Sequence, residues 1–456
     1  MEPQKQYYYP LPKEAVENCA KNIFGPILTG ECVTSVWVGS AGRRTVIKFI
    51  IENIGLFKEI IPDYQKYLLV YIEPLDLLEE SLAAYLRLVG QSVITACEMK
   101  KNCLGSFDKK QFKIFNNENA SYPQLLAVLK LLIGNITGHE LKVVIFLGEI
   151  DELLFVNSVF CNNLRSLWNS FSGKLHYVFL IKEIKMIFDK DRVGEELGEL
   201  FLQNVVYEPI SRQNADYVID RMSYRFGYSP SQEEKKVAKE MCGGHPYFLK
   251  VTCKLLSKKN GTKSLSTQEL IDLLRRNYEI RSVAQRMIDV QTDKAKENLK
   301  NITEEKIATL EGEQVKVLEW LGLIEKDQDG YYQPFCLLFQ DAISKRIIEK
   351  TKGTNQIGEL SYDAKSGALS FRGQSIEEKF SCQEYEVLIF LLKERNKLCS
   401  RDEISKVLWG KDSYEKYSDW AIDQLMSKLR KKIAALRVKN GRLITVRGRG
   451  YKFAID

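Results

Sequence analysis

Short apolar runs alternate with helix-length amphipathic segments over residues 33–210. The runs are rich in β-branched and aromatic residues, which is typical of strands. They are Val33–Val38, Leu68–Ile72, Val143–Leu147, Tyr177–Ile181 and Asn204–Glu208. Strands joined by helix-length crossovers pair in parallel. The pattern therefore predicts a parallel α/β sheet, covered by helices, within a domain spanning residues 1–210.

Helical periodicity dominates the residues that follow. Ser211 is a plausible N-cap for a helix through Ala215–Met222, which opens a helical region over 211–261. Residues 262–350 continue as helices, and Val317–Ile324 precedes a turn at Asp327–Gly330 and an aromatic strand. A helix, a turn containing Asp and Gly, and an aromatic strand predict a small winged-helix module. The polar stretch 351–356 is the expected linker.

The remaining residues, 357–456, predict three helices and a hairpin. A first buried helix covers Gln383–Lys393, and Ser400–Glu403 has the form of a capping box for a helix ending at Trp409-Gly410. A third helix, about Ser418–Leu436, has an apolar stripe of Ala421, Ile422, Leu425, Met426 and Leu429. The hairpin is Ile444–Phe453, in which Tyr451 and Phe453 should point inward.

Composition indicates a multidomain globular protein. The chain has 456 residues, 45% hydrophobic and 28% charged, which is too long for a single core. We find no apolar run long enough for a membrane span and no secretion signal, so we expect a cytoplasmic protein with no membrane partner. Ten scattered cysteines without a CxxC pair indicate reduced thiols, and three histidines make a zinc site improbable, so no metal is expected.

The positive charge is concentrated near the C-terminus. Residues 418–452 contain 10 Lys and Arg against 2 Asp, a net charge of +8, although the whole chain carries only +7. A basic helix followed by an arginine-bearing hairpin is typical of a protein that binds double-stranded DNA. A solvated basic helix face would not by itself explain the hairpin.

These C-terminal residues resemble the OmpR/PhoB-type winged-helix DNA-binding family. The resemblance implies short strands over Ile357–Ser375, a recognition helix for the major groove, and a wing whose glycines Gly448 and Gly450 adopt positive dihedrals. It implies that Trp420, Gln424, Ser427 and Lys428 lie near the bases, and that Arg430 and Lys431 contact phosphates. It also implies that the ring nitrogen of Trp409 lies at the DNA backbone, and that Arg447 and Arg449 of the wing enter the minor groove.

The recognition helix departs from the family at two positions. Family members often carry arginine where Trp420 stands and histidine where Leu425 stands, so a DNA site preference cannot be transferred. Packing and DNA contact are both open for Trp420. The alternative for the whole module, a winged helix used only for protein contacts, is disfavoured by the charge of +8.

Residues 33–250 resemble the STAND branch of AAA-like P-loop ATPases, close to the origin-recognition type. The matching landmarks are Gly39–Thr45 after the first strand, Glu149 after the third, and Gly243–Leu249 in the helical lid. The resemblance implies a nucleotide site, with ATP or ADP as its ligand. Its residues would be Gly39, Gly42, Arg43, Arg44, Thr45, Glu149, His245 and Pro246. Alternatively, Gly39–Thr45 is an ordinary turn, and His245-Pro246 is a packed histidine before a helix-entry proline.

Both nucleotide motifs are degenerate. Arg44 stands where the phosphate-binding lysine is expected, Arg43 replaces a glycine, and Gly148 replaces the magnesium-directing aspartate. Three hypotheses therefore stay open: a nucleotide that is sensed without turnover, an empty site in a retained scaffold, and slow hydrolysis. No cofactor is certain, and we do not expect an enzyme beyond weak ATPase activity.

Taken together, the sequence predicts a multidomain α/β + α chain: a P-loop-type sheet domain with a helical lid, a middle helical/winged-helix domain, and a C-terminal winged helix-turn-helix. An early acidic pair of a phosphorelay receiver is absent from Trp37–Gly42. We expect a transcriptional regulator whose N-terminal module senses a signal or mediates oligomerisation. Its expected partners are DNA, further copies of itself as a dimer or higher oligomer, and RNA polymerase. The alternatives are a nucleotide-hydrolysing STAND ATPase switch and a partner-recruiting scaffold.

Overall fold

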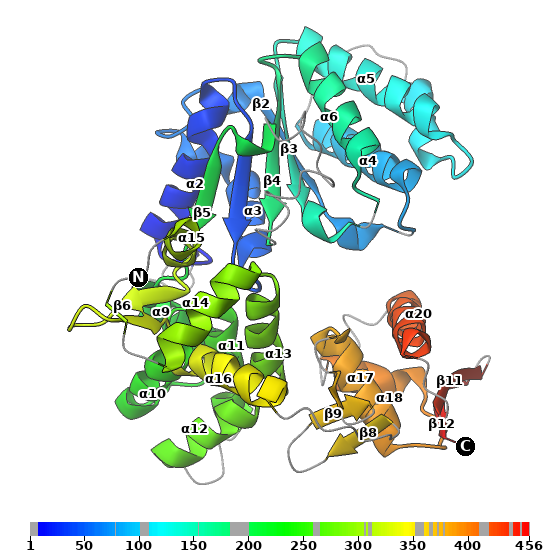
Figure 1. Ribbon diagram of the computed structural model, residues 1–456. Helices are drawn as coiled ribbons and strands as arrows, with labels where there is room; N and C mark the ends of the chain where they lie inside the picture. The colour runs from blue at the N-terminus through cyan, green and yellow to red at the C-terminus, as the bar shows by residue number, and fades with distance from the viewer. Residues whose placement is uncertain are drawn as a thin grey trace. The chain divides into compact units, whose positions relative to one another are not determined.

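The five predicted strands form one parallel sheet in the computed structural model (Figure 1). Their order is β2-β3-β4-β1-β5. The strands are β1 (Val33–Trp37), β2 (Tyr67–Ile72), β3 (Lys142–Gly148), β4 (Leu175–Ile181) and β5 (Val205–Glu208). Three strands begin one or two residues before the predicted start, because backbone pairing continues there, as between Leu175 and Val143. The predicted parallel α/β fold is confirmed.

The structure describes most of the chain, in segments. The described residues are 8–77, 79–100, 109–153, 155–182, 200–258, 265–304, 307–308, 312–351, 360–363, 368–371, 374–376, 379–409, 419–436, 441–446 and 449–455. They fall into two compact units. One unit is Met1–Lys263 with Asp289–Leu337, and the other is Ser264–Ile288 with Leu338–Asp456. The predicted 262–350 domain is thus divided between the two units. Of the predicted linker 351–356, Thr351 is the last residue of a helix, and 352–356 lie outside the described residues.

Helices lie on both sides of the sheet. Figure 1 shows α4, α5 and α6 together on one side, away from α2. This arrangement follows from right-handed crossovers, since the chain runs in one direction across the sheet from β1 to β2 and in the other from β2 to β4. The helices are α2 (Lys13–Leu28), α3 (Arg43–Glu52), α4 (Leu82–Met99), α5 (Tyr122–Gly138) and α6 (Ser158–Ser170).

The lid begins with one turn that the sequence did not predict. Ser211 precedes a short 3-10 turn, Arg212–Asn214, and makes no side-chain capping bond, so its predicted role as a helix N-cap is wrong. The helix proper, α9, is Ala215–Phe226 and ends at Gly227, whose φ is +65°. It is followed by α10 (Gln232–Cys242) and α11 (Pro246–Lys258).

A small hairpin follows the lid in the same unit. Its strands are the antiparallel pair β6 (Ile324–Lys326) and β7 (Tyr332–Pro334), which follow the helices α14 (Asp293–Glu304) and α15 (Glu313–Trp320). The predicted turn is present: the Asp327 carboxylate accepts the backbone N–H groups of Asp329 and Tyr331, and Gly330 has a φ of +85°. The helix ends earlier than predicted, because Gly322 adopts a positive φ of +66°.

The second unit contains the C-terminal domain. Its elements are α12 (Thr267–Arg276), α13 (Tyr278–Asp289), α16 (Leu337–Thr351), β8 (Leu360–Asp363), β9 (Ala368–Phe371), β10 (Gln374–Ser375), α17 (Cys382–Lys393), α18 (Arg401–Trp409), α20 (Asp419–Ala435), β11 (Gly441–Val446) and β12 (Gly450–Ile455). Its core joins all three predicted helices to the hairpin, with Leu388, Ile404, Met426 and Phe453 fully or almost fully buried. The predicted capping box is present, because Glu403 N–H bonds Ser400 Oγ and Ser400 N–H bonds the Glu403 carboxylate.

A search of the described residues for membrane-crossing helices finds none with the required length and apolar character.

Candidate functional site

The predicted recognition helix, α20, has one buried and one exposed face. Ile422, Met426 and Leu429 are fully buried in the domain core. Lys428 and Lys431 are exposed, and no ion pair involves either of them within the described part of the chain. Gln424 and Ser427 are half-buried at the boundary of the two faces. The helix therefore presents two free cations next to two polar side chains, which suits phosphate and base-edge contacts.

Of four further predicted DNA-binding residues, only Arg449 has a described side chain. Trp409 is the last residue of α18 and Trp420 is the second residue of α20, but their side chains lie outside the described structure. Arg447 lies outside the described residues altogether. Arg449 is exposed, and its backbone N–H donates to Val446 O across the hairpin at 3.0 Å.

Arg430 has contacts that differ from those of its neighbours on α20. Its Nη2 donates to Thr445 Oγ1 at 2.6 Å and its Nε donates to Leu443 O at 3.3 Å. Both acceptors belong to β11, the first strand of the wing. Arg430 therefore joins the recognition helix to the wing. Its predicted phosphate contact stays a prediction, and these bonds favour a positioning role.

A second set of contacts fixes α20 to α18 and β12. Asp423 accepts hydrogen bonds from Arg401 Nη2 at 2.9 Å and from the Tyr451 hydroxyl, and Arg401 also lies over the Tyr451 ring. Burial opposes ionisation of Asp423, but the bonds from Tyr451 and Arg401 outweigh it and lower its pKa. Burial and the bond to Asp423 raise the pKa of Tyr451 to about 12. The group is therefore an ionised carboxylate between two donors.

The wing also depends on Gly450. Its φ is +133°, and a Cβ atom at this position would lie 2.1 Å from Cys399 O. Cys399 and Tyr451 exchange two backbone hydrogen bonds of 2.8 Å, which pairs the segment before α18 with β12. The positive dihedral predicted for Gly450 is confirmed, and the close strand approach is a second reason for glycine. Tyr451 and Phe453 are buried as predicted.

The predicted phosphate loop lies between β1 and α3 in the first unit. Ser40 and Gly42 adopt positive φ values of +61° and +92°, and α3 begins at Arg43. Left-handed residues before a helix N-terminus direct backbone N–H groups into one concave turn, which suits an anion. Gly39 lies in the same turn, and Thr45 is exposed in the first turn of the helix. The backbone geometry is thus retained although the side chains differ.

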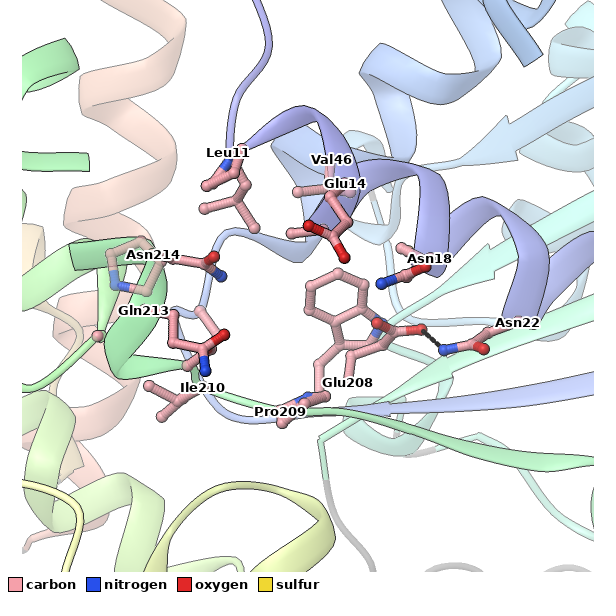
Figure 2. Close-up of a pocket in the computed structure, with 18 of the residues that line it drawn as sticks. Leu11, Glu14, Asn18, Asn22, Val46, Glu208, Pro209, Ile210, Gln213 and Asn214 are labelled. Carbon is pink, nitrogen blue, oxygen red and sulfur yellow. Dashed lines mark hydrogen bonds between the residues drawn. The ribbon is translucent and has the colours of Figure 1, made fainter. Parts of the chain in front are cut away.

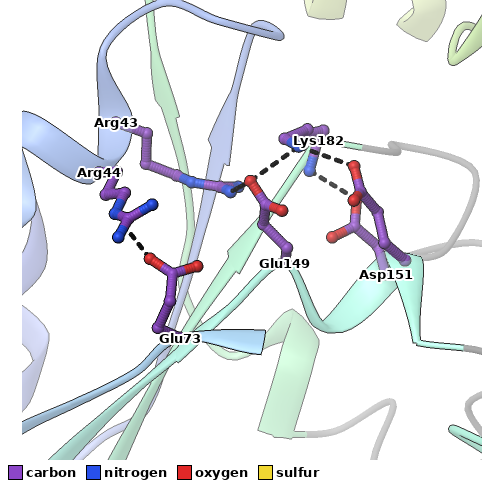
Figure 3. A network of polar contacts seen from close by, with 7 residues as sticks. Arg43, Arg44, Glu73, Glu149, Asp151 and Lys182 are labelled. Atoms are coloured by element: carbon purple, nitrogen blue, oxygen red, sulfur yellow. Dashed lines mark hydrogen bonds and ion pairs between the residues drawn. The ribbon is translucent and has the colours of Figure 1, made fainter. Parts of the chain in front are cut away.

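Arg43 is buried against the end of β3 (Figure 3). Its Nη2 lies 2.7 Å from Glu149 Oε1, and only 6% of its side chain is exposed. Lys182 Nζ lies 2.8 Å from the same carboxylate oxygen and 2.7 Å from Glu152. Burial opposes ionisation of Glu149, but Lys182 and Arg43 outweigh it and lower its pKa. The chain itself therefore supplies two cations to this carboxylate.

Arg44 is paired with a different strand end. Its Nε lies 2.7 Å from Glu73 Oε2, directly after β2. Burial raises the pKa of Glu73 and Arg44 opposes the shift. Figure 3 shows Arg43 and Arg44 side by side, with their guanidinium groups directed to the two carboxylates. In a working phosphate loop, a lysine stands at the place of Arg44 and reaches the phosphates of the nucleotide.

The packing around Gly148 leaves no room for the aspartate that the second nucleotide motif has at this position. A Cβ atom at this position would lie 2.8 Å from Ile72 O and 3.2 Å from the Tyr71 hydroxyl, so a side chain does not fit without displacing β2. A magnesium–nucleotide complex needs a carboxylate here and free cations in the loop. The described side chains do not fit that complex, although nucleotide binding itself stays a prediction.

His245 connects the lid to the phosphate loop. Its ring is fully buried, stacks on Phe248 at 4.2 Å, and has Nε2 3.0 Å from Gly39 O. Nδ1 accepts the Phe248 N–H, so in the neutral ring Nε2 carries the proton and donates to Gly39 O. Burial lowers the His245 pKa to about 4. These contacts match the packed-histidine alternative, and Pro246 is the first residue of α11.

Glu73 and Lys182 were not among the site residues predicted from the sequence. Both follow a strand directly, and the carboxyl ends of parallel strands meet at one edge of a sheet. Once the parallel sheet was predicted, charged residues at strand ends were the available signal. Asp151, whose Oδ2 accepts the Lys182 backbone N–H at 2.7 Å, belongs to the same group.

Comparison with protein families identifies the C-terminal domain. Residues 377–453 match the family described as "Transcriptional regulatory protein, C terminal". The chain is also 27% identical over 143 residues to the uncharacterized transcriptional regulatory protein YvcP of Bacillus subtilis. That match covers 29% of this chain and 59% of the relative, so the chain spans less than two thirds of the relative's length.

Solved structures similar to this chain include three from archaea. They are the Aeropyrum pernix ORC2 protein (TM-score 0.43, 11% identity, 77% of this chain and 99% of that chain), the Walker-type ATPase paby2304 of Pyrococcus abyssi (0.46, 12%, 73% and 95%) and Cdc6p of Pyrobaculum aerophilum (0.39, 14%, 76% and 98%). Residues 377–453 thus match a C-terminal domain of transcriptional regulatory proteins, and the N-terminal part of the chain contains a five-stranded parallel α/β sheet.

Proposed function

We propose that this protein is a DNA-binding transcriptional regulator. The observation that carries the proposal is the exposed pair Lys428 and Lys431 on the outer face of α20, in a domain that matches transcriptional regulators. In this role α20 enters the major groove, and Arg449 with the rest of the wing approaches the minor groove. Tandem or paired half-sites and contact with RNA polymerase are part of the proposal.

The N-terminal module, in this proposal, senses a signal or mediates oligomerisation without hydrolysing ATP. The supporting observation is the buried ion pair of Arg43 with Glu149, at 2.7 Å. The carboxylate that would orient water is neutralised by the chain itself, and Gly148 leaves no room for a metal-directing side chain. Both observations favour the hypothesis of a retained scaffold over slow hydrolysis.

DNA binding is tested with the full-length protein in two steps. Genome-wide footprinting first identifies a duplex, and fluorescence anisotropy then measures its affinity at several salt concentrations. We expect Lys428→Ala/Lys431→Ala to weaken binding and to reduce the salt slope by about 2, since each lost phosphate contact removes about 0.9. Lys294→Ala/Lys300→Ala on α14 removes the same charge from exposed positions of the other unit and serves as the control. Equal effects of the two double variants would contradict the proposed DNA-binding face.

The competing ATPase switch is tested by phosphate release from Mg–ATP. We expect no release above background for the wild-type chain. Release that disappears in Glu149→Gln would establish the switch and refute the non-hydrolysing module, while leaving the DNA-binding proposal intact.

A further inference from the structure

A cavity of about 640 Å³ lies in the first unit, beside the carboxyl ends of β1 and β5 (Figure 2). Its walls come from α2, from the turn before α3, and from the first residues of the lid, including Ile210 and Asn214. Carboxyl ends of parallel strands are the usual place for a ligand in an open α/β sheet. A molecule in this cavity would therefore touch the sheet and the lid together.

The charge of the cavity is negative. Glu14 and Glu208 are acidic, Asn18 and Asn22 add amide oxygens, and the described lining residues include no lysine or arginine. Figure 2 shows Glu14 and Asn18 directed toward the interior from the same helix. Arg43 and Arg44 line none of it, because they are paired with Glu149 and Glu73. The described walls thus carry no cationic side chain that would neutralise phosphate groups.

Glu208 is the most informative side chain in this cavity. It is only 8% exposed, and it accepts hydrogen bonds from the Asn22 amide, at a long 3.3 Å, and from the Cys19 thiol. No ion pair with a described lysine or arginine compensates it. Burial raises its pKa to about 7. A buried carboxylate without a counter-ion is costly, and a cationic ligand would remove that cost.

Trp37 lies next to this carboxylate. Trp37 and Glu208 are register partners on β1 and β5, so their side chains project to the same face of the sheet. The indole Nε1 donates to Ser35 Oγ at 2.8 Å, which fixes the ring. A carboxylate beside an indole is a favourable environment for an ammonium or guanidinium group. Leu11, Val46 and Ile210 provide apolar surface for the rest of a ligand.

We propose that this cavity binds an organic cation, in which an ammonium or guanidinium group on an apolar body pairs with Glu208 beside Trp37. The inference deepens the proposed function by naming the ligand class of its sensing module. Only the effect of the ligand on transcription rests on that function, because binding is measurable without DNA.

The test uses the full-length protein, isothermal calorimetry and matched probes. Tryptamine, phenethylamine and benzamidine are the cations, and tryptophol, phenethyl alcohol and benzamide are their neutral counterparts. We expect at least one cation to bind about tenfold or more tightly than its neutral counterpart, because only the cation compensates the buried charge. Equal binding within every pair, or no binding of any cation at millimolar concentration, would overturn the proposal.

Two variants, one on β5 and one on α2, distinguish binding in the cavity from general attraction to surface charge. Glu208→Gln should weaken the best cation about tenfold or more, whereas Glu17→Gln, which removes a carboxylate of α2 outside the cavity, should leave it unchanged. If Glu208→Gln does not fold, as judged by circular dichroism, Glu14→Gln takes its place with the same expected direction. Unchanged affinity in a folded variant refutes the site.

The same calorimetry with Mg–ATP and Mg–ADP measures whether a nucleotide binds in the cavity instead. Nucleotide binding that displaces the cation and exceeds its affinity would overturn the proposal in favour of a nucleotide site. DNA affinity is titrated separately, so a cation that fails to bind leaves the DNA-binding proposal untouched, and a chain that fails to bind DNA leaves the cavity proposal untouched.

Discussion

Arg43 illustrates how one substitution changes what a site can do. A glycine at this position would leave Glu149 with Lys182 as its cation, whereas the arginine adds a second, buried ion pair. Removing Glu149 would leave the buried Arg43 guanidinium without this carboxylate, which costs more than the pair itself contributes. The position is therefore informative about stability as well as about catalysis.

This reasoning predicts coupling between the two side chains. We expect Arg43→Met and Glu149→Gln each to destabilise the first unit, and the double variant to be less destabilised than the sum by about 1–3 kcal/mol. Chemical unfolding of the four proteins of the cycle measures this. A coupling energy near zero would show that the pair does not stabilise the fold.

Glu208 predicts a pH dependence of stability. Its folded pKa of about 7 lies above the usual value of 4.5. The contribution is therefore fully present below about pH 4.5 and is lost as the pH rises through about 7, at a cost of about 3 kcal/mol. Thermal unfolding between pH 5 and 8 should show a decline in wild type that is smaller in Glu208→Gln. Parallel pH profiles for the two proteins would be evidence against an uncompensated carboxylate.

The recognition helix is held to the wing by two independent sets of contacts. Arg430 bonds β11, and Asp423 connects Arg401 of α18 with Tyr451 of β12. Because both sets lie between elements, they set the angle between the helix and the wing, which the proposed docking on DNA depends on. They fix the orientation of the helix and the wing in a domain whose core is apolar.

Arg430 allows a positioning role to be separated from a phosphate contact. We expect Arg430→Ala to weaken DNA binding with little change in the salt slope, because the lost bonds are to Thr445 and Leu443 rather than to phosphate. Lys431→Ala should instead reduce the slope by about 0.9. Anisotropy titrations at several salt concentrations measure both. A slope change in Arg430→Ala equal to that of Lys431→Ala would restore the phosphate role predicted from sequence.

Strands and wing could be predicted from sequence because their causes are local. Buried parallel strands are continuous apolar runs, as Val143–Leu147 is. The tight turn of the hairpin needs a positive φ, which Gly450 supplies whatever surrounds the hairpin. The ion pairs could not be predicted this way. Lys182 meets Glu149 only because the strand order places β3 beside β4, and no spacing along the chain contains that information.

The cavity was missed for a similar reason. Glu208 was placed correctly in a strand, but its burial depends on α2 and the lid, which are far from it in sequence. His245 shows the opposite case, since a family motif suggested nucleotide contact and the packing of the ring on Phe248 and Gly39 O suggests a structural role. Motifs locate a position, and packing determines its chemistry.

At the level of the whole chain, the DNA-binding domain should retain its specificity when isolated. We expect the 357–456 fragment to prefer the same duplex as the full chain, because its core is formed by residues 369–453 with Tyr278 packed against it. Its affinity should be lower if the remainder mediates oligomerisation, since avidity is then lost. Anisotropy on one duplex compares the two, with circular dichroism as the folding control. Tighter binding by the fragment would instead identify the rest of the chain as an inhibitor of DNA binding.

The internal guanidinium of Arg43 has a consequence for physiology. The ratio of ATP to ADP falls in starving cells, and a regulator that responds to this ratio changes its output with nutrition. Under the proposed function, a regulator whose own side chain already pairs with Glu149 does not hydrolyse ATP and so does not convert one form into the other. Under the proposed function, its promoter occupancy should follow its inducer alone, and chromatin immunoprecipitation from fed and starved cells should give the same profile.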